Sequence, residues 1–131
     1  MEIPVELCQI LINETINQQI VVLREKEGDR SFPIVIGLPE IIAIDRRIKG
    51  EVLPRPMTHD LLANVIEQMG GQIQKVVIND LRDHTFYAVI HVHAHGKHIE
   101  IDSRPSDAIA LSAGLEIPLF VDEQVFDQLQ N

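Results

Sequence analysis

Alternating hydrophobic and polar residues dominate the first part of the chain. Ile3, Val5 and Leu7 occupy every second position, which is the period of a strand with one buried face. Two further apolar stretches predict two more strands before the first predicted helix. Residues 13–17 form a polar connection between the first two strands. The predicted strands are residues 2–12, 19–24 and 32–36.

The next two segments carry apolar residues at the three- and four-residue spacing of amphipathic helices. The first helix follows Gly37 and ends at Lys49, and the second begins at Thr58, its predicted N-cap, and stops before Gly70. The predicted buried positions are Ile41, Ile44 and Ile48 in the first helix and Leu61, Leu62, Val65, Ile66 and Met69 in the second.

A second set of strands follows these helices, and the turns between the strands are too short for any arrangement but antiparallel neighbours. A two-residue turn at His95-Gly96 lets the apolar residues share one face. This register pairs Val92 with Ile99 on the core face and His91 with Glu100 on the opposite face. The predicted strands are residues 73–80, 85–93 and 97–102.

The last part of the chain alternates between helix and strand. The apolar run 108–111 predicts a helix, 117–121 predicts a strand, and Asp122 caps a short helix that ends at Leu129. We therefore predict one α+β domain over residues 1–131, with a mixed, largely antiparallel sheet and helices packed on it.

Composition limits the classes of function. The chain has 131 residues, of which 45% are hydrophobic and 4% aromatic, so its core is aliphatic. The formal net charge of −9 opposes binding to a polyanion unless basic residues cluster or a cation intervenes. Cys8 is the single cysteine, and we expect a buried, unreactive thiol. We expect a cytoplasmic protein with no membrane partner, because no signal-peptide pattern or membrane-spanning apolar run occurs.

The most distinctive polar stretch joins the strand at 97–102 to the helix after it. Asp102 ends the strand, Arg104 precedes Pro105, and Ser106 and Asp107 enter the helix. Proline suits the first turn of a helix. A hydroxyl group can accept hydrogen bonds from the unpaired backbone N–H groups there, and a carboxylate is favoured near the positive end of the helix dipole. The residues alone leave two readings open: a capped helix start with an Asp–Arg pair, or a functional site.

The ten residues 102–111, Asp-Ser-Arg-Pro-Ser-Asp-Ala-Ile-Ala-Leu, resemble the signature of the bifunctional nuclease domain family. Three other segments are similar to that family in the same order along the chain. They are residues 36–44 with Ile36-Gly37, Glu40 and Ala43-Ile44, residues 55–62 with Arg-Pro-Met-Thr-His-Asp-Leu-Leu, and residues 83–88 with Asp83 and Thr85-Phe86-Tyr87-Ala88. The resemblance implies a small α+β domain and cleavage of DNA and RNA.

On this resemblance we expect a metal-assisted nuclease whose partner is nucleic acid and whose cofactor is a divalent cation such as magnesium. Carboxylates hold such cations, and arginine binds phosphate bidentately. The expected catalytic residues are Glu40, Asp60, Asp102, Arg104 and Asp107, with Asp102 and Asp107 as metal ligands; the expected substrate-binding residues are Arg55, His59, Arg104 and Ser106. The alternative is a non-catalytic binding or regulatory module whose Arg–Asp clusters are structural. We also expect a homo-oligomer, because so aliphatic a domain leaves apolar surface uncovered.

Histidines form a second group with possible chemistry. The hairpin register places His91, His93 and His98 with Glu100 on one sheet surface, where a transition metal could bind. No HExxH or CxxC spacing supports a metal site, and the family signature lacks these histidines. We therefore predict a polar, solvent-facing surface without a tightly bound metal.

Overall fold

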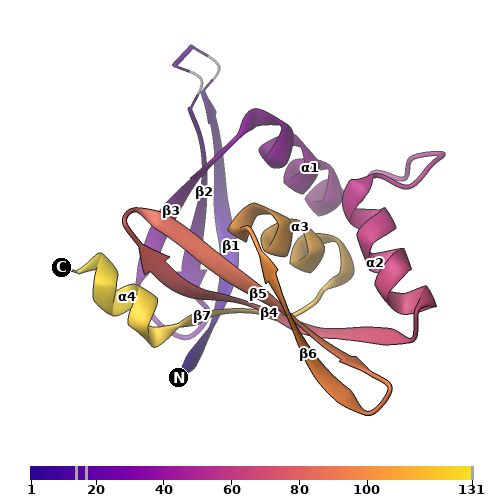
Figure 1. Ribbon diagram of the computed structural model, residues 1–131. Coiled ribbons are helices and arrows are strands. Elements are labelled where there is room, and N and C mark those ends of the chain that lie inside the picture. Colours follow the sequence, from indigo (N-terminus) through magenta and orange to yellow (C-terminus); the bar gives the residue numbers. More distant parts are fainter. Residues whose placement is uncertain (14, 17, 131) are drawn as a thin grey trace.

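The computed structural model describes residues 1–131 except positions 14, 17 and 131. The predicted connection 13–17 includes two of these positions and so lies partly outside the described residues. The strands are β1 (Glu2–Asn13), β2 (Gln18–Glu25), β3 (Ser31–Ile36), β4 (Gly71–Arg82), β5 (Thr85–Ala94), β6 (Lys97–Ser103) and β7 (Leu119–Asp122), and the helices are α1 (Leu38–Lys49), α2 (Thr58–Gln68), α3 (Pro105–Leu115) and α4 (Glu123–Leu129). Figure 1 shows these elements.

The described strands form one seven-stranded sheet in the order β3-β2-β1-β7-β4-β5-β6. It consists of two antiparallel meanders, β1–β2–β3 and β4–β5–β6, joined by β7. Ile3 of β1 pairs antiparallel with Val121 of β7, while Phe120 of β7 pairs parallel with Val77 of β4. A parallel pair needs a crossover connection, and α3 lies within the one that leads to β7. The predicted α+β class with a mixed, largely antiparallel sheet is confirmed.

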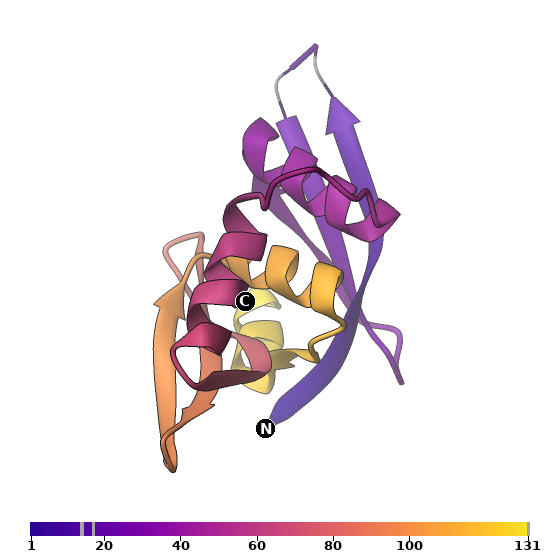
Figure 2. The same ribbon diagram turned by 90° about the vertical axis from the view of Figure 1, so that its right-hand side faces the viewer.

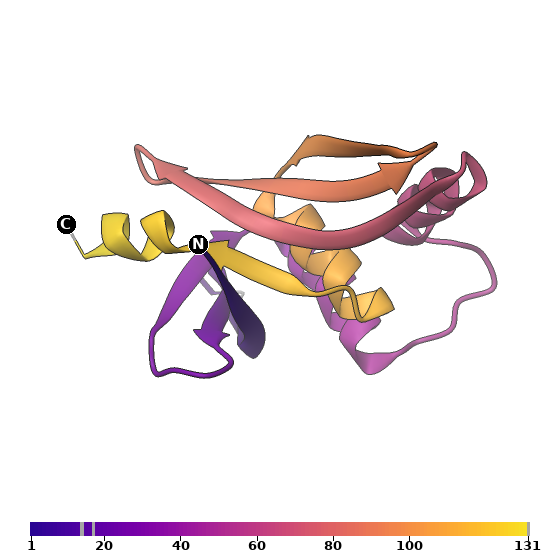
Figure 3. The ribbon, with the colours of Figure 1, turned by 90° about the horizontal axis from the view of Figure 1, so that it is seen from below.

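The sheet is strongly curled, as the view from below shows (Figure 3). Phe32 of β3 and Phe86 of β5 belong to different meanders, yet their rings stack with centroids 5.5 Å apart. Phe126 of α4 meets Phe32 edge to face at 5.4 Å. The curl therefore brings the two meanders together around one apolar core.

Helix α3 lies in the centre of the molecule, packed against α1, α2, β4 and β5 (Figure 2). Its residues 108–111 are at most 1% exposed because they face neighbours on several sides. Ile41 and Ile44 of α1 are fully buried, as predicted, but Ile48 is 48% exposed, since it lies in the last turn of the helix. The central position of α3 fixes its N-terminal end relative to α1 and α2.

Helix α2 buries a narrower face than its sequence predicts. Ala63 is buried, and Leu62 and Ile66 pack partly buried against the core. Leu61, Val65 and Met69, at four-residue spacing, are 56%, 44% and 73% exposed. The prediction is wrong for these three, because the apolar arc of α2 is wider than the surface it contacts.

The hairpin of β5 and β6 has the predicted register, in which Val92 pairs with Ile99 and His91 with Glu100. Ile99 is nevertheless 41% exposed, since β6 is the edge strand of the sheet. His91, expected to face solvent, is only 9% exposed, although it does not belong to the apolar core cluster. The register is therefore confirmed, whereas the predicted burial of this edge is not.

Two local features differ from the sequence-based expectation. Cys8 is exposed because the pairing of β1 with β2 shifts between Leu7 and Gln9, which leaves Cys8 in a bulge. The N-cap of α2 is Met57 rather than Thr58. In contrast, Asp122 caps α4 as predicted, accepting a hydrogen bond from the backbone N–H of Gln124 at 3.1 Å.

Among the described residues, no helix is both long and apolar enough to cross a membrane.

Candidate functional site

A cavity of about 560 Å³ opens between α1, α2 and α3. Charged and polar side chains from all three helices reach its wall, most of them from the sequence segments that resemble the nuclease signature. The lining includes Glu40, Arg46 and Arg47 of α1, His59 and Asp60 of α2, and Arg104 and Asp107 at the start of α3. Three helices that are separate in the sequence therefore build one polar site on the rim of the core.

The joint between β6 and α3 positions two of these side chains. Pro105 is the first residue of α3, and the residue before a proline is driven out of helical backbone geometry. Arg104 is accordingly extended, with φ −75° and ψ 148°, and serves as the N-cap. Its side chain turns toward the first turn of the helix, where Asp107 lies three positions later. The strand-to-helix transition therefore creates an arginine–carboxylate pair at the mouth of the cavity.

A continuous hydrogen-bonded chain connects the three helices at this mouth. His59 Nε2 lies 2.9 Å from Asp107 Oδ1. Arg104 donates from Nε to Asp107 Oδ2 at 3.1 Å and from Nη1 to Glu40 Oε1 at 3.2 Å. The side chain of His59 is 11% exposed and that of Asp107 29%, whereas that of Arg104 is 64% exposed. The pair of His59 and Asp107 is thus held inside, and a guanidinium in contact with solvent covers it.

The electrostatics keep Asp107 ionised. Partial burial alone would raise the pKa of the Asp107 carboxyl, but the hydrogen bonds from Arg104 and His59 outweigh it and leave that pKa below its usual value. An ionised carboxylate can only accept, so His59 donates its Nε2–H to Asp107. The other ring nitrogen, Nδ1, has no hydrogen-bond partner among the described residues.

Arg47 and Asp60 form a second ion pair at the cavity. The guanidinium of Arg47 bonds to Asp60 Oδ1 and to the backbone carbonyl of Ala110 in α3. Asp60 also accepts the backbone N–H of Met57 at 3.1 Å. Burial would raise the pKa of Asp60, but these hydrogen bonds lower it below its usual value. The Arg47 side chain is only 9% exposed. Because it bonds to Asp60 of α2 and to the Ala110 carbonyl of α3, it ties all three helices together.

Two buried polar atoms at the cavity have no hydrogen-bond partner among the described residues: Glu40 Oε2 and Arg47 Nη2. The first is a carboxylate oxygen in the first turn of α1, and the second is a guanidinium nitrogen that lies against Gly114. A buried polar atom without a partner is costly and often marks a ligand site. One acceptor and one donor therefore lie unpaired beneath the cavity wall, both shielded from solvent.

The structure brings together only some of the residues proposed from the sequence. Glu40, His59, Asp60, Arg104 and Asp107 line the cavity. Ser106 is buried and lines a neighbouring hollow next to Arg104 and Glu40, within the helix rather than at its cap.

Asp102 and Arg55 do not reach the cavity wall. Asp102 alternates with Ile101 along β6, so it lies on the sheet face of Glu100, opposite the helices. Arg55 lies exposed in the connection between α1 and α2. Asp102 and Arg55 therefore do not join Asp107 at the cavity, and the expected metal pair of Asp102 and Asp107 lies on two different sides of the sheet.

Arg47 is one of the charged cavity residues that sequence reasoning missed, together with Arg46 and Glu51. It follows Ile44 by three positions and so lies next to the buried stripe of α1, a helical spacing that could have revealed it. Its position near the end of α1 instead fits the general preference for basic residues in the last turn. The pairing with Asp60 depends on how α2 packs, which the helical spacing does not specify.

Comparison with known proteins identifies the family. The family model of the bifunctional nuclease domain matches residues 21–131. The chain belongs to the bifunctional nuclease domain family. An uncharacterized protein of Mycobacterium tuberculosis is 37% identical over 124 residues, which are 95% of this chain and 74% of that protein.

Plant relatives carry the family name. Bifunctional nuclease 2 of Oryza sativa subsp. japonica is 28% identical over 115 residues, or 84% of this chain and 35% of that protein. Bifunctional nuclease of Oryza minuta is 24% identical over 109 residues, or 80% of this chain and 33% of that protein. The chain thus spans about a third of these plant proteins.

Proposed function

We propose that the cavity hydrolyses phosphodiester bonds of DNA and RNA. The observation that carries the proposal is the pair of His59 and Asp107 next to the accessible guanidinium of Arg104, in a member of a nuclease family. A carboxylate-oriented imidazole is a general acid–base group, and a guanidinium binds phosphate oxygens. Together they supply the two functions that phosphodiester cleavage needs.

In the proposed reaction, Arg104 holds the scissile phosphate at the mouth of the cavity. His59 Nδ1 accepts a proton from an attacking water while the water oxygen forms a bond to phosphorus. The bond from phosphorus to the leaving sugar oxygen breaks on the opposite side, that oxygen takes up a proton from solvent water, and the imidazolium later releases its own proton to solvent. Asp107 keeps the imidazole oriented and stabilises its positive charge between these two transfers.

The carboxylates of the cavity differ in their fitness for a magnesium ion. Both oxygens of Asp107 and both oxygens of Asp60 are engaged by hydrogen-bond donors. Glu40 retains one oxygen without a partner, and magnesium in phosphate sites is commonly held by one or two carboxylates together with substrate phosphates and water. We therefore propose Glu40, rather than Asp102 with Asp107, as the protein ligand. A bound magnesium ion would offset phosphate charge and lower the pKa of a coordinated water.

The acidic surface limits how nucleic acid is bound. Arg46, Arg47 and Arg104 share the cavity wall with Glu40, Glu51, Asp60 and Asp107, so the wall is not strongly basic. With a net charge of −9, we expect contact with few phosphates and weak binding outside the reacting bond.

The decisive experiment measures cleavage of labelled single-stranded and duplex DNA and RNA by purified Asp107→Asn protein. Asn keeps the shape of the side chain but removes its charge, so we expect a loss of about 10²–10⁴-fold in rate with little change in folding. Asp45→Asn is the matched control, because Asp45 pairs with Lys49 on the surface of α1 and should cleave like the wild type.

Three results would count against the proposal. Full activity in folded Asp107→Asn protein would remove this residue from the site. Equal losses in both variants would show that the effect is not local. A wild-type protein that shows no cleavage at any magnesium concentration would favour the non-catalytic binding module.

Chelation by EDTA should abolish cleavage, and Glu40→Gln should raise the magnesium concentration needed to restore it.

Self-association stays a prediction. The exposed side chains of Leu61, Val65 and Met69 on α2 form an apolar stripe of the kind that interfaces cover. Light scattering of the protein as it elutes from a size-exclusion column measures its mass, and a monomer at all concentrations would contradict the prediction.

A further inference from the structure

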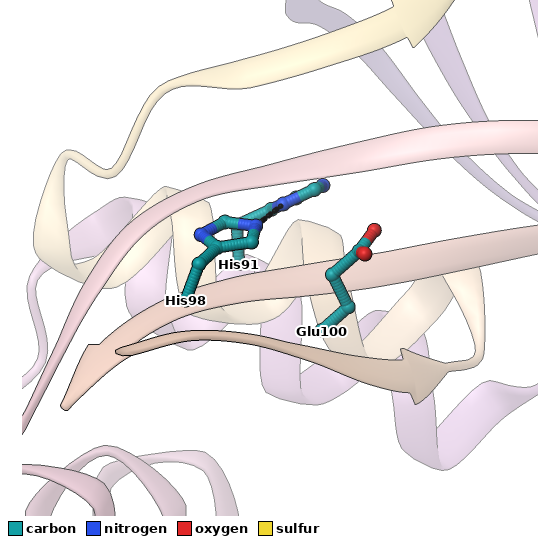
Figure 4. A group of neighbouring side chains, drawn as sticks. All are labelled: His91, His98 and Glu100. Carbon is teal, nitrogen blue, oxygen red and sulfur yellow. Dashed lines mark hydrogen bonds between the residues drawn. The ribbon is translucent and has the colours of Figure 1, made fainter. Parts of the chain in front are cut away.

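The sheet face opposite the helices carries a second cluster of side chains with potential ligand atoms. His91 of β5 and His98 and Glu100 of β6 point toward one another there (Figure 4). One ligand atom of each residue lies within 4.8 Å of the other two. This face is separated from the cavity between the helices by the sheet itself, so the cluster is independent of the proposed nuclease site.

The distance between the two imidazoles is close to that of shared metal coordination. His91 Nδ1 lies 2.9 Å from His98 Nε2, and the ring planes are inclined by 32°. Two nitrogens bound to one tetrahedral ion at about 2.0–2.1 Å are separated by only slightly more than this. A small spreading of the rings therefore suffices to admit an ion between them.

The hairpin register explains how the cluster forms. His91 pairs directly with Glu100, and His98 pairs with His93, so His91 and His98 are diagonal neighbours across the two strands. Diagonal partners lie within reach of long side chains. His93 alternates onto the same face but is not part of the cluster. The residues that converge are thus a specific subset of those on the polar face.

We propose that His91, His98 and Glu100 form a site for a transition-metal ion of the zinc type. Two imidazoles and one carboxylate are a ligand set that zinc uses in proteins, with the fourth position open to water. His98 and Glu100 are exposed, which gives an ion access from solvent, while the low exposure of His91 anchors the site to the sheet. This proposal revises the expectation of a metal-free face, which rested on sequence spacing and on the absence of these histidines from the family signature.

Protonation is compatible with metal binding. In the hydrogen bond between the rings, one of the two facing nitrogens carries the proton and the other accepts it. A metal ion needs a lone pair on each facing nitrogen, so each ring would carry its proton on its far nitrogen in the metal-bound form.

The neighbouring charges act in opposite directions. Lys75 of β4 lies opposite His91 in the sheet, and its positive charge disfavours a bound cation. Lys75 Nζ is paired with Glu2 Oε1 at 2.6 Å, which offsets that charge. When Glu100 is counted as well, this face carries no net positive charge and can accept a divalent ion.

Zinc titration of protein purified without a histidine tag tests the site, with a chromogenic chelator as competitor. We expect one zinc per chain, bound at least about tenfold more weakly by His98→Ala and by Glu100→Gln. His93→Ala is the matched control, because it removes an exposed histidine from the same face and should change the affinity by less than twofold. Both ligand positions tested are exposed, so the variants should fold.

Cobalt provides a second readout with the same variants. Cobalt bound in a tetrahedral site gives visible absorption, which we expect in the wild type and in His93→Ala but not in His98→Ala. The proposal is overturned if the wild type binds zinc no more tightly than His98→Ala does. Equal weakening by His93→Ala and His98→Ala also overturns it, because that result is typical of scattered surface histidines. Neither result bears on cleavage by the cavity on the other face.

Discussion

His59 Nε2 lies 2.9 Å from Asp107 Oδ1, although 48 positions separate the two residues in the sequence. Each residue lies in the first turn of its own helix, and α2 and α3 pack together so that these turns meet. Because Asp107 is ionised, the contact fixes the tautomer of His59 and directs Nδ1 away from its partner. The proposed chemistry depends on this packing, not on either helix alone.

The first prediction concerns Arg104→Gln. Because the Arg104 side chain is 64% exposed, we expect the free energy of unfolding to change by less than about 1 kcal/mol. Loss of one phosphate contact should weaken nucleic-acid binding and reduce the slope of its salt dependence by about 1. Fluorescence anisotropy of a labelled oligonucleotide at several salt concentrations measures both effects.

The control for this variant is Arg24→Gln. Arg24 forms a similar exposed ion pair with Glu6, at 3.0 Å, in a part of the sheet that does not contribute to the cavity. Its removal should leave binding and salt dependence unchanged. If both variants reduce the salt slope equally, Arg104 is only part of the general surface charge.

In contrast to Arg104→Gln, Arg47→Met should mainly reduce the stability of the fold. Arg47 is buried and bonds to Asp60 in α2 and to the Ala110 carbonyl in α3, so its loss removes charge-assisted hydrogen bonds that join three helices. We expect a loss of about 1.5–3 kcal/mol in the free energy of unfolding, measured by chemical denaturation. Arg46→Met, which removes a half-exposed neighbour that lies 3.9 Å from Glu51, is the control and should cost much less. Similar losses in both variants would argue that Arg47 does not hold the helices together.

The order of the elements and the hairpin register could be predicted from the sequence, because both depend on local periodicity. The pairing of Val92 with Ile99 follows from the turn length and the alternation of apolar residues. The exposure of Ile99 could not be predicted in this way, since it depends on which strand ends the sheet. That position is fixed by β7, which inserts between β1 and β4.

The candidate site also contains residues whose position the sequence could predict and residues whose position it could not. The motif residues that lie at helix starts, such as Glu40 and Asp107, do line the cavity, because helix starts gather at one rim of the core. Asp102 precedes the same helix but points to the other sheet face, since successive residues of a strand alternate. Sequence proximity to the signature was therefore a poor guide where the chain is still extended.

The turn between β4 and β5 gives a stability prediction. Asp83 and His84 have φ values of 48° and 66°, as a type I′ turn requires, and histidine tolerates this geometry less well than glycine. We expect His84→Gly to raise the free energy of unfolding by about 0.5–1 kcal/mol, partly offset by the entropy of the unfolded glycine. His84→Ala is the control, because it removes the ring without relieving φ and should not stabilise. If both variants stabilise equally, the ring rather than the backbone is the source of the cost.

The last prediction concerns the pH dependence of stability, which reports on Asp107. Its pKa in the folded protein lies below the ordinary value of 3.8, so the unfolded chain binds a proton more readily than the folded one does in the range between the two values. The stabilisation from its hydrogen bonds with Arg104 and His59 is therefore fully present above pH 3.8 and is lost as the pH falls through the folded pKa. Asp107→Asn cannot ionise, so the difference in unfolding free energy between wild type and variant should shrink as the pH falls below about 4. Urea denaturation at half-unit steps of pH measures this difference. Asp60, whose pKa is also lowered, is present in both proteins and cancels in the comparison. If the difference stays constant down to pH 3, the charge of Asp107 does not contribute to stability. Another contact would then have to orient His59.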